Sequence, residues 1–242
     1  MSRLIYGVHP VEEALRRRRE EVQGLLVARR GALPPVIAEA QARGVPVQHL
    51  SDQELEALCG AASHQGLAAI VGDYPYLELE DLLEARDPPP LIVVLDSITD
   101  PQNLGAIIRS AAFLGATGIV LPKDRAAPIT PAVVRVSAGA SEHALCARVT
   151  NLARALEQLK SAGIWVVGAV EKGGVAPEQI DLAGPAALVL GNEQKGIRPL
   201  VLRGCDIVTT IPAPRSSVGS LNVAAAATAL LHEAARQRRS KG

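Results

Sequence analysis

The feature that most constrains the fold is a series of short, uninterrupted apolar runs in the second part of the chain, starting at Leu91. The runs read LIVVLD, GIVLP, IWVVGAV, ALVLG and DIVTTIP. Runs without polar alternation are typical of strands that are buried on both faces of a parallel sheet. Between them lie stretches with the spacing of amphipathic helices, at about 103–114, 131–138, 152–162 and 220–239. Alternating strands and helices predict an α/β domain, with helices on both faces of a parallel sheet.

The first part of the chain, residues 1–72, predicts a smaller α/β unit of its own. We expect strands at 22–28, 45–50 and 66–71, and helices at 10–18, 34–42 and 52–59. The third helix begins with a capping box formed by Ser51 and Glu54. An acidic segment ending in three prolines follows, and prolines prevent a helix from continuing. We therefore expect residues 73–90 to be a linker and residues 91–242 to be a second domain.

Composition narrows the classes of function. Only 2% of the residues are aromatic, which argues against a surface that binds by stacking bases on aromatic rings. The chain is neutral overall, but residues 91–242 carry 16 basic and 11 acidic residues, an excess that permits a polyanionic partner. The three cysteines lack the spacing of metal ligands, so no metal is expected. The sequence has neither the pattern of a signal peptide nor that of a membrane span, which predicts a soluble cytoplasmic protein.

Polar residues follow three of the predicted strands, at the carboxyl ends where parallel α/β sheets bind ligands. After the first strand, Asp100 and Pro101 predict the start of a helix, with a capping aspartate and a proline in the first turn. Asn103 and Arg109 lie six residues apart on this helix, so they need not share a face. From spacing alone, Arg109 is either a solvent-facing arginine or a functional group that points inward.

The second loop contains Gly191, Asn192 and Glu193. It fits a plain turn with Gly191 at positive φ, a phosphate-binding loop or one lip of an active site. A Walker-type loop is disfavoured, because Ile197 follows Gly196 where Lys and Ser or Thr are needed. No GxGxxG sequence follows a strand, so the dinucleotide-binding fingerprint and the glycine signature of Rossmann methyltransferases are both absent.

The third loop leads from Ile211 into the last helix. Ser220 is expected to be the N-cap of this helix, whereas Asn222 is a poor helix former with no evident structural duty. The start of a helix also offers free N–H groups to an anion. The apolar stretch from Leu221 to Leu231 fits either a subunit interface or the internal core.

Together and in this order, the three loops resemble the SpoU/TrmH family of SPOUT RNA ribose methyltransferases. The matching segments are DPQNLGAIIRSA, LVLGNEQKGI and SLNVAAAATALL in the second domain, and IYGVHPVEEAL and HQGLAAIV in the first. The resemblance implies that the first domain is the family's small L30e-like RNA-binding domain. It also implies a SPOUT (α/β-knot) second domain with a C-terminal trefoil knot, S-adenosylmethionine as cofactor, and a homodimer whose knotted domains share the active site.

Within the family, the sequence is most similar to the enzymes that methylate a guanosine 2′-hydroxyl in large-subunit (23S) ribosomal RNA. The partner that this implies is RNA, and neither DNA nor a membrane. One alternative is a transfer-RNA 2′-O-ribose methyltransferase of the same family. Another is a non-catalytic RNA-binding factor of ribosome assembly, although the residues that match the family's site are all present in this chain.

Residue by residue, the resemblance implies an active site and a cofactor site. The residues at the methyl-accepting hydroxyl would be Asn103, Arg109, Glu193, Ser220 and Asn222. Arg109 would act as the base or stabilise the forming alkoxide, an unusual role for a group that normally stays protonated. Glu193 is the more conventional alternative as the base, and the other residues would orient Arg109 and the ribose. The residues that match cofactor contacts are Leu190, Gly191, Ile211, Ser220 and Leu221, where Gly191 would let the backbone approach the cofactor.

The chain departs from the family pattern at two places. Gln194 follows the Asn-Glu pair, where the family usually has glycine. The third motif, residues 211–217, is one residue longer than the usual Ile-Pro-Met with a glycine shortly after. Both departures fall in loops that are expected to hold the cofactor.

Overall fold

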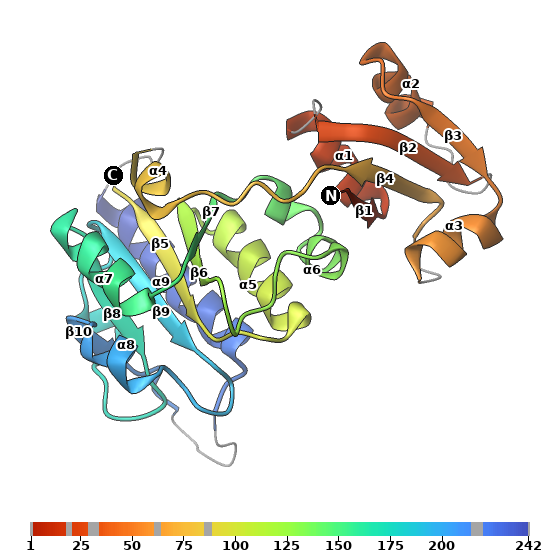
Figure 1. Ribbon diagram of the computed structural model, residues 1–242. Helices are drawn as coiled ribbons and strands as arrows, with labels where there is room; N and C mark the ends of the chain where they lie inside the picture. The colour runs from red at the N-terminus through yellow and green to blue at the C-terminus, as the bar shows by residue number, and fades with distance from the viewer. Residues whose placement is uncertain are drawn as a thin grey trace. The chain divides into compact units, whose positions relative to one another are not determined.

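The computed structural model describes residues 2–17, 21–28, 34–60, 64–84, 89–213 and 220–241. The chain divides into two compact units (Figure 1). Unit 1 comprises residues 1–75 and 129–143, and unit 2 comprises residues 76–128 and 144–242. No helix within the described ranges combines the length and the apolar character that crossing a membrane requires.

Unit 1 is built on a mixed four-stranded sheet in the order β1-β4-β2-β3. Its strands are β1 (Arg3–Tyr6), β2 (Val22–Ala28), β3 (Val47–Leu50) and β4 (Leu67–Val71), and its first helices are α1 (Val8–Arg17), α2 (Pro34–Ala42) and α3 (Asp52–Cys59). The capping box predicted for α3 is confirmed. Ser51 Oγ accepts a hydrogen bond from the N–H of Glu54 at 3.2 Å, and Glu54 Oε2 accepts one from the N–H of Ser51 at 2.7 Å. β1 was not predicted, because RLIY is too short for a pattern to identify it.

A segment that lies between two strands of unit 2 in the sequence packs into unit 1. It contains α6 (Pro131–Val136) and the 3-10 turn η3 (Ala140–Glu142). Tyr74 Oη donates to the carbonyl oxygen of Ser141 at 2.9 Å, and Arg3 Nη2 lies 3.7 Å from Oε2 of the fully buried Glu142 side chain. Gly139 approaches α1 so closely that an added Cβ would lie 3.1 Å from the Cα of Pro10. Contacts between residues far apart in the sequence therefore assign this segment to unit 1.

Unit 2 is built on a six-stranded sheet in the order β10-β8-β9-β5-β6-β7, in which every pairing is parallel. The strands are β5 (Leu91–Asp96), β6 (Gly118–Pro122), β7 (Cys146–Val149), β8 (Trp165–Ala169), β9 (Ala186–Gly191) and β10 (Ile207–Thr209). Each of the five apolar runs supplies one strand, so the predicted parallel sheet is confirmed. β7 was missed because Arg148 interrupts its four residues, CARV, so the strand leaves no continuous apolar run in the sequence.

Helices cover both faces of this sheet, as predicted. The longer ones are α5 (Pro101–Phe113), α7 (Leu152–Ser161) and α9 (Val223–Lys241), and α8 (Pro199–Arg203) is short. Figure 1 shows α7 and α8 in front of the sheet and α9 behind it. α5 packs against α9, where Ser110 Oγ and Thr228 Oγ1 lie 2.7 Å apart.

The segment 73–90, expected to be a linker, contains a helix that the sequence analysis did not predict. This helix, α4 (Leu79–Glu84), buries Leu79 and Leu82 in the core of unit 2. Leu82 packs so tightly on Gly118 that a Cβ added there would lie 2.7 Å from Leu82 Cδ1. Two leucines three residues apart are enough to dock a short helix, but too few to stand out in an acidic sequence.

The central strands of unit 2 bring their carboxyl ends to one edge of the sheet. The last residue of β5, Asp96, is paired with the last residue of β9, Gly191. On the other side of β9, the end of β8 is paired with that of β10 through Ala169 and Thr209. The loops that leave these strands therefore begin next to one another, which is where the sequence predicted the site.

Candidate active site

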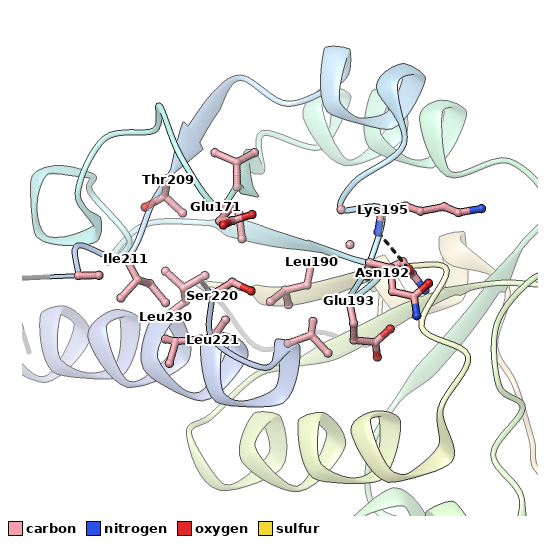
Figure 2. A pocket seen from close by; sticks show the side chains of 18 of the residues that line it. Glu171, Leu190, Asn192, Glu193, Lys195, Thr209, Ile211, Ser220, Leu221 and Leu230 are labelled. Carbon is pink, nitrogen blue, oxygen red and sulfur yellow. Dashed lines mark hydrogen bonds between the residues drawn. The ribbon is translucent and has the colours of Figure 1, made fainter. Parts of the chain in front are cut away.

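A cavity of about 630 Å³ lies at this edge of unit 2, where the loops after β8, β9 and β10 meet the start of α9 (Figure 2). Its lining comprises Ala169, Val170, Glu171, Leu190, Gly191, Asn192, Glu193, Gln194, Lys195, Gly196, Thr209, Ile211, Pro212, Ala213, Ser220, Leu221, Val223, Ala226 and Leu230. All five residues that the resemblance implied for the cofactor are in this set. Apolar side chains with a few polar groups, in a cavity of this size, are typical of a site for a small organic ligand.

The loop after β9 forms a tight turn that is held from within. The N–H of Asn192 donates to the carbonyl oxygen of Gly196 at 3.1 Å. The N–H of Gly196 donates in return to the carbonyl oxygen of Asn192 at 2.8 Å. Asn192 Oδ1 accepts from the N–H groups of Gln194 at 3.0 Å and Lys195 at 3.2 Å. Asn192 Nδ2 donates to the carbonyl oxygen of Ser97 at 3.0 Å, which ties the turn to the end of β5. The turn is therefore a preformed wall of the cavity.

Two glycines make this turn possible for different reasons. The positive φ, +65°, belongs to Gly196 and not to Gly191, so the alternative of a plain turn with a left-handed Gly191 is wrong. Gly191 is required by space instead, because an added Cβ would lie 2.2 Å from the carbonyl carbon of Gly196 and 2.2 Å from the nitrogen of Ile197. The close approach at Gly191 is thus one between two parts of the same loop.

A buried carboxylate fixes the far end of the turn. Asp96 is fully buried at the end of β5, and its Oδ2 accepts from the N–H of Arg198 at 2.8 Å. Its Oδ1 accepts from Arg198 Nε at 2.7 Å and from Ser97 Oγ at 3.1 Å. Charge-assisted hydrogen bonds of this kind are stronger than neutral ones. Sequence reasoning missed this role, although a single aspartate ending an apolar run is a signal that could have found it.

Three of the residues expected at the reacting hydroxyl form a hydrogen-bonded cluster beside the cavity. Asn103 Nδ2, in the first turn of α5, donates to Glu193 Oε1 at 2.6 Å. Asn222 Nδ2, at the start of α9, donates to Asn103 Oδ1 at 2.9 Å. These residues come from three segments far apart in the sequence, and Glu193 also lines the cavity. The chain thus joins them into one polar group of donors and acceptors.

The start of α9 differs from the prediction. The helix begins at Val223, and Asn222 Oδ1 accepts from the N–H of Ala224 at 2.8 Å, which is the geometry of an N-cap. The N-cap predicted at Ser220 is therefore wrong, and Asn222 has the structural duty that the sequence analysis did not find for it. Ser220 instead lies in the exposed lining of the cavity. Of the longer third motif, residues 214–217 lie outside the described part of the chain.

Arg109 is not brought to this cluster within one chain. The predicted start of its helix is confirmed, since Asp100 Oδ1 accepts from the N–H of Gln102 at 3.0 Å and Pro101 follows. Six residues at about 100° each place Arg109 about 120° around α5 from Asn103. Its side chain is exposed, does not line the cavity, and makes no hydrogen bond or ion pair within the described ranges.

Three further polar residues of the cavity were not anticipated from the sequence. Glu171 follows β8, Lys195 lies in the turn after β9, and Thr209 ends β10. Each stands at or just beyond the carboxyl end of a predicted strand, and this position was the signal that could have found them.

Two protein-family models match this chain. The model described as the SpoU rRNA Methylase family matches residues 90–232, and the model described as RNA 2′-O ribose methyltransferase substrate binding matches residues 4–77. The chain is 41% identical to the 23S rRNA (guanosine-2′-O-)-methyltransferase RlmB of Pseudomonas putida, over 100% of both chains. It is 39% identical to the protein of that name from Shewanella oneidensis, over 98% of both chains.

Solved structures resemble the fold along almost the whole chain. The SpoU methyltransferase AviRb from Streptomyces viridochromogenes, in complex with AdoMet, superposes with a TM-score of 0.85 at 29% identity, covering 99% of this chain and 91% of that one. An AdoMet-bound rRNA methyltransferase from Sinorhizobium meliloti gives a TM-score of 0.82 at 28% identity, covering 97% and 87%. These neighbours confirm the predicted α/β architecture of a small first domain followed by a domain with a parallel sheet.

Proposed function

Because the chain belongs to the SpoU rRNA methylase family, we propose that it is an S-adenosylmethionine-dependent RNA 2′-O-ribose methyltransferase. Its substrate is a guanosine 2′-hydroxyl of 23S ribosomal RNA, as the names of its full-length relatives suggest. The observation that carries this proposal is the Asn103–Glu193–Asn222 cluster, which stands beside a ligand-sized cavity at the carboxyl edge of the sheet.

The cavity fits S-adenosylmethionine in size and lining. Leu190, Ile211 and Leu221 offer apolar contact for an adenine ring, and the backbone at Gly191 and Ser220 offers hydrogen-bonding groups at the wall. When bound, S-adenosylmethionine supplies an electrophilic methyl group to the ribose oxygen. The task left to the protein is to hold two partners in line, and such positioning contributes several kcal/mol in well-oriented reactions.

The polar cluster of Asn103, Glu193 and Asn222 orients the ribose of the RNA substrate. The Asn103 amide is fixed at both ends, with its nitrogen donating to Glu193 and its oxygen accepting from Asn222. Asn222 is itself fixed, because its oxygen caps α9. A hydroxyl placed against this group meets side chains whose rotamers are already set, which lowers the cost of aligning its oxygen. Ser220 lies nearby on the cavity wall as a further hydrogen-bonding group.

Arg109 either accepts the proton of the hydroxyl or stabilises the negative charge that develops on the ribose oxygen. The Glu193 carboxylate is the alternative proton acceptor. A ribose hydroxyl is a very weak acid, so its proton must leave or its charge must be stabilised for the oxygen to react. Arg109 is exposed and does not line the cavity of its own chain. In a homodimer whose knotted domains share the active site, Arg109 of the partner subunit completes the cluster.

The chain is organised as an RNA-binding domain and a catalytic domain. Residues 1–72 form the L30e-like domain that binds the RNA substrate, supported by the match of the substrate-binding family model to residues 4–77. Unit 2 is the SPOUT catalytic domain, which includes helix α4 of the segment 73–90 and most of residues 91–242, and its C-terminal part is threaded as a trefoil knot. A substrate in ribosomal RNA is consistent with a cytoplasmic protein.

Methyl transfer from labelled S-adenosylmethionine to unmodified 23S ribosomal RNA tests the function, with transfer RNA as a second substrate. We expect label on 23S ribosomal RNA, a large loss in Arg109→Ala, and unchanged transfer in Arg203→Ala, a matched exposed arginine on α8. Label on transfer RNA alone would overturn the substrate. Tight RNA binding without transfer to either RNA would identify a non-catalytic assembly factor.

A further inference from the structure

Glu171 lines the cavity but takes no part in the polar cluster of Asn103, Glu193 and Asn222. It lies two residues beyond the end of β8 and lines the cavity. In Figure 2 it lies at the same end of the cavity as Thr209 and Ile211, whereas Asn192 and Glu193 lie at the opposite end. Glu171 is therefore separated from the cluster that would hold the RNA ribose.

The loop that carries Glu171 is held on both sides by β10 and the residue after it. Before Glu171, the N–H of Val170 donates to the carbonyl oxygen of Thr209 at 2.9 Å, and Thr210 Oγ1 donates to that of Val170 at 3.1 Å. After Glu171, the N–H of Gly174 donates to Thr210 Oγ1 at 2.9 Å. Gly174 also packs so closely that an added Cβ would lie 2.5 Å from the carbonyl carbon of Thr209. The backbone at Glu171 is thus fixed at the cavity wall.

The carboxylate of Glu171 has no partner among the residues that the structure describes, since it makes no hydrogen bond or ion pair with them. The other acids near the site are engaged, because Glu193 accepts from Asn103 and Asp96 accepts from Arg198. An exposed carboxylate on a fixed backbone, which lines a cavity and has no partner among the described residues, is available to a ligand, and it can accept from two donors at once.

We propose that Glu171 accepts hydrogen bonds from the two ribose hydroxyls of the adenosyl group, an inference that rests on the proposed cofactor. The apolar side chains at its end of the cavity, Ile211 and Leu230, suit the adenine ring, and the ribose carries that ring (Figure 2). A vicinal diol presents two O–H donors to the two oxygens of one carboxylate. An acidic side chain has the same duty toward a ribose in other parallel α/β folds.

Calorimetric titration with two ligands tests this assignment. S-adenosylhomocysteine has the ribose and the amino-acid part, whereas 5′-methylthioadenosine has the ribose and lacks the amino acid. We expect Glu171→Ala to weaken the binding of both ligands by about 10- to 100-fold, as the loss of hydrogen bonds to a charged group predicts. Glu171→Gln, which keeps the shape and one acceptor oxygen, should weaken both by a smaller factor.

The control is Lys172→Ala, an exposed neighbour that does not line the cavity and should leave both affinities unchanged. Equal affinities in the wild type and both Glu171 variants would identify Glu171 as a solvated surface acid and overturn the inference. Weakening of S-adenosylhomocysteine alone would move the contact to the amino-acid ammonium group and overturn the ribose assignment. If the wild type bound neither ligand, the proposed cofactor would fall, and this inference with it.

Discussion

Replacing Gly191 by alanine tests whether the turn after β9 is as tightly closed as described. The new methyl carbon would lie 2.2 Å from two backbone atoms, the carbonyl carbon of Gly196 and the nitrogen of Ile197. Backbone atoms cannot swing aside as the end of a flexible side chain can, so the turn itself must move. Overpacking of this kind costs about 1–3 kcal/mol and sometimes more.

For a chain of this size, each kcal/mol lowers the melting temperature by about 2–4 °C, so Gly191→Ala should melt about 2–12 °C below the wild type. Because Gly191 lines the cavity, the displaced turn should also weaken the binding of S-adenosylhomocysteine by at least about tenfold. Thermal unfolding followed by circular dichroism and calorimetric titration give the two readouts.

Gly184→Ala is the matched control, since a Cβ added there meets no atom within 4 Å. It should melt within about 2 °C of the wild type or slightly above it, because alanine narrows the conformational freedom of the unfolded chain. A Gly191→Ala protein with the melting temperature and ligand affinity of the wild type would refute the described closure of the turn.

Three further predictions concern side chains around the site. Asp96→Asn removes the charge that binds Arg198 and should lower stability by about 1–3 kcal/mol in denaturant unfolding, and an unchanged midpoint would contradict the role of this pair. Asn222→Ala should cost about 1 kcal/mol through the lost N-cap and reduce methyl transfer, whereas Asn222→Asp should restore stability but not transfer, because Asp cannot donate to Asn103. Burial raises the pKa of Cys205 to about 11, so alkylation by iodoacetamide should be slow at pH 8 and accelerate as the pH approaches 11. Labelling of Cys205 in the folded protein at pH 8 as fast as in the denatured chain would contradict a raised pKa of this partly buried thiol.

The sequence predicted what local pattern determines. The apolar runs identified β5, β6, β8, β9 and β10. The signature is clearest for β5, β6 and β9, because strands buried along almost their whole length leave an uninterrupted apolar run. Capping chemistry identified the starts of α3 and α5, because Ser51 and Asp100 act on N–H groups two or three residues away. The three loops at the carboxyl ends of strands pointed to the region that the cavity occupies.

What the sequence missed depends on contacts between distant residues. α4 forms because Leu79 and Leu82 dock on the core of unit 2, and the segment 129–143 packs with unit 1 through partners such as Tyr74. The cap of α9 moved from Ser220 to Asn222, because either residue type is a good cap and tertiary structure decides where the helix begins. The spacing of Arg109 from Asn103 showed only that the two need not share a face, and it could not show that Arg109 is exposed and does not line the cavity of its own chain.

The central claim is that this site methylates a ribose 2′-oxygen. The most direct measurement is mass spectrometry of nucleosides from 23S ribosomal RNA after reaction with the purified protein and S-adenosylmethionine. Asn103→Ala, which removes the amide that joins Glu193 to Asn222, serves as the comparison. We predict a gain of 2′-O-methylguanosine with the wild type and a loss of that gain in the variant. A methyl group on the base, or a variant as active as the wild type, would contradict the account.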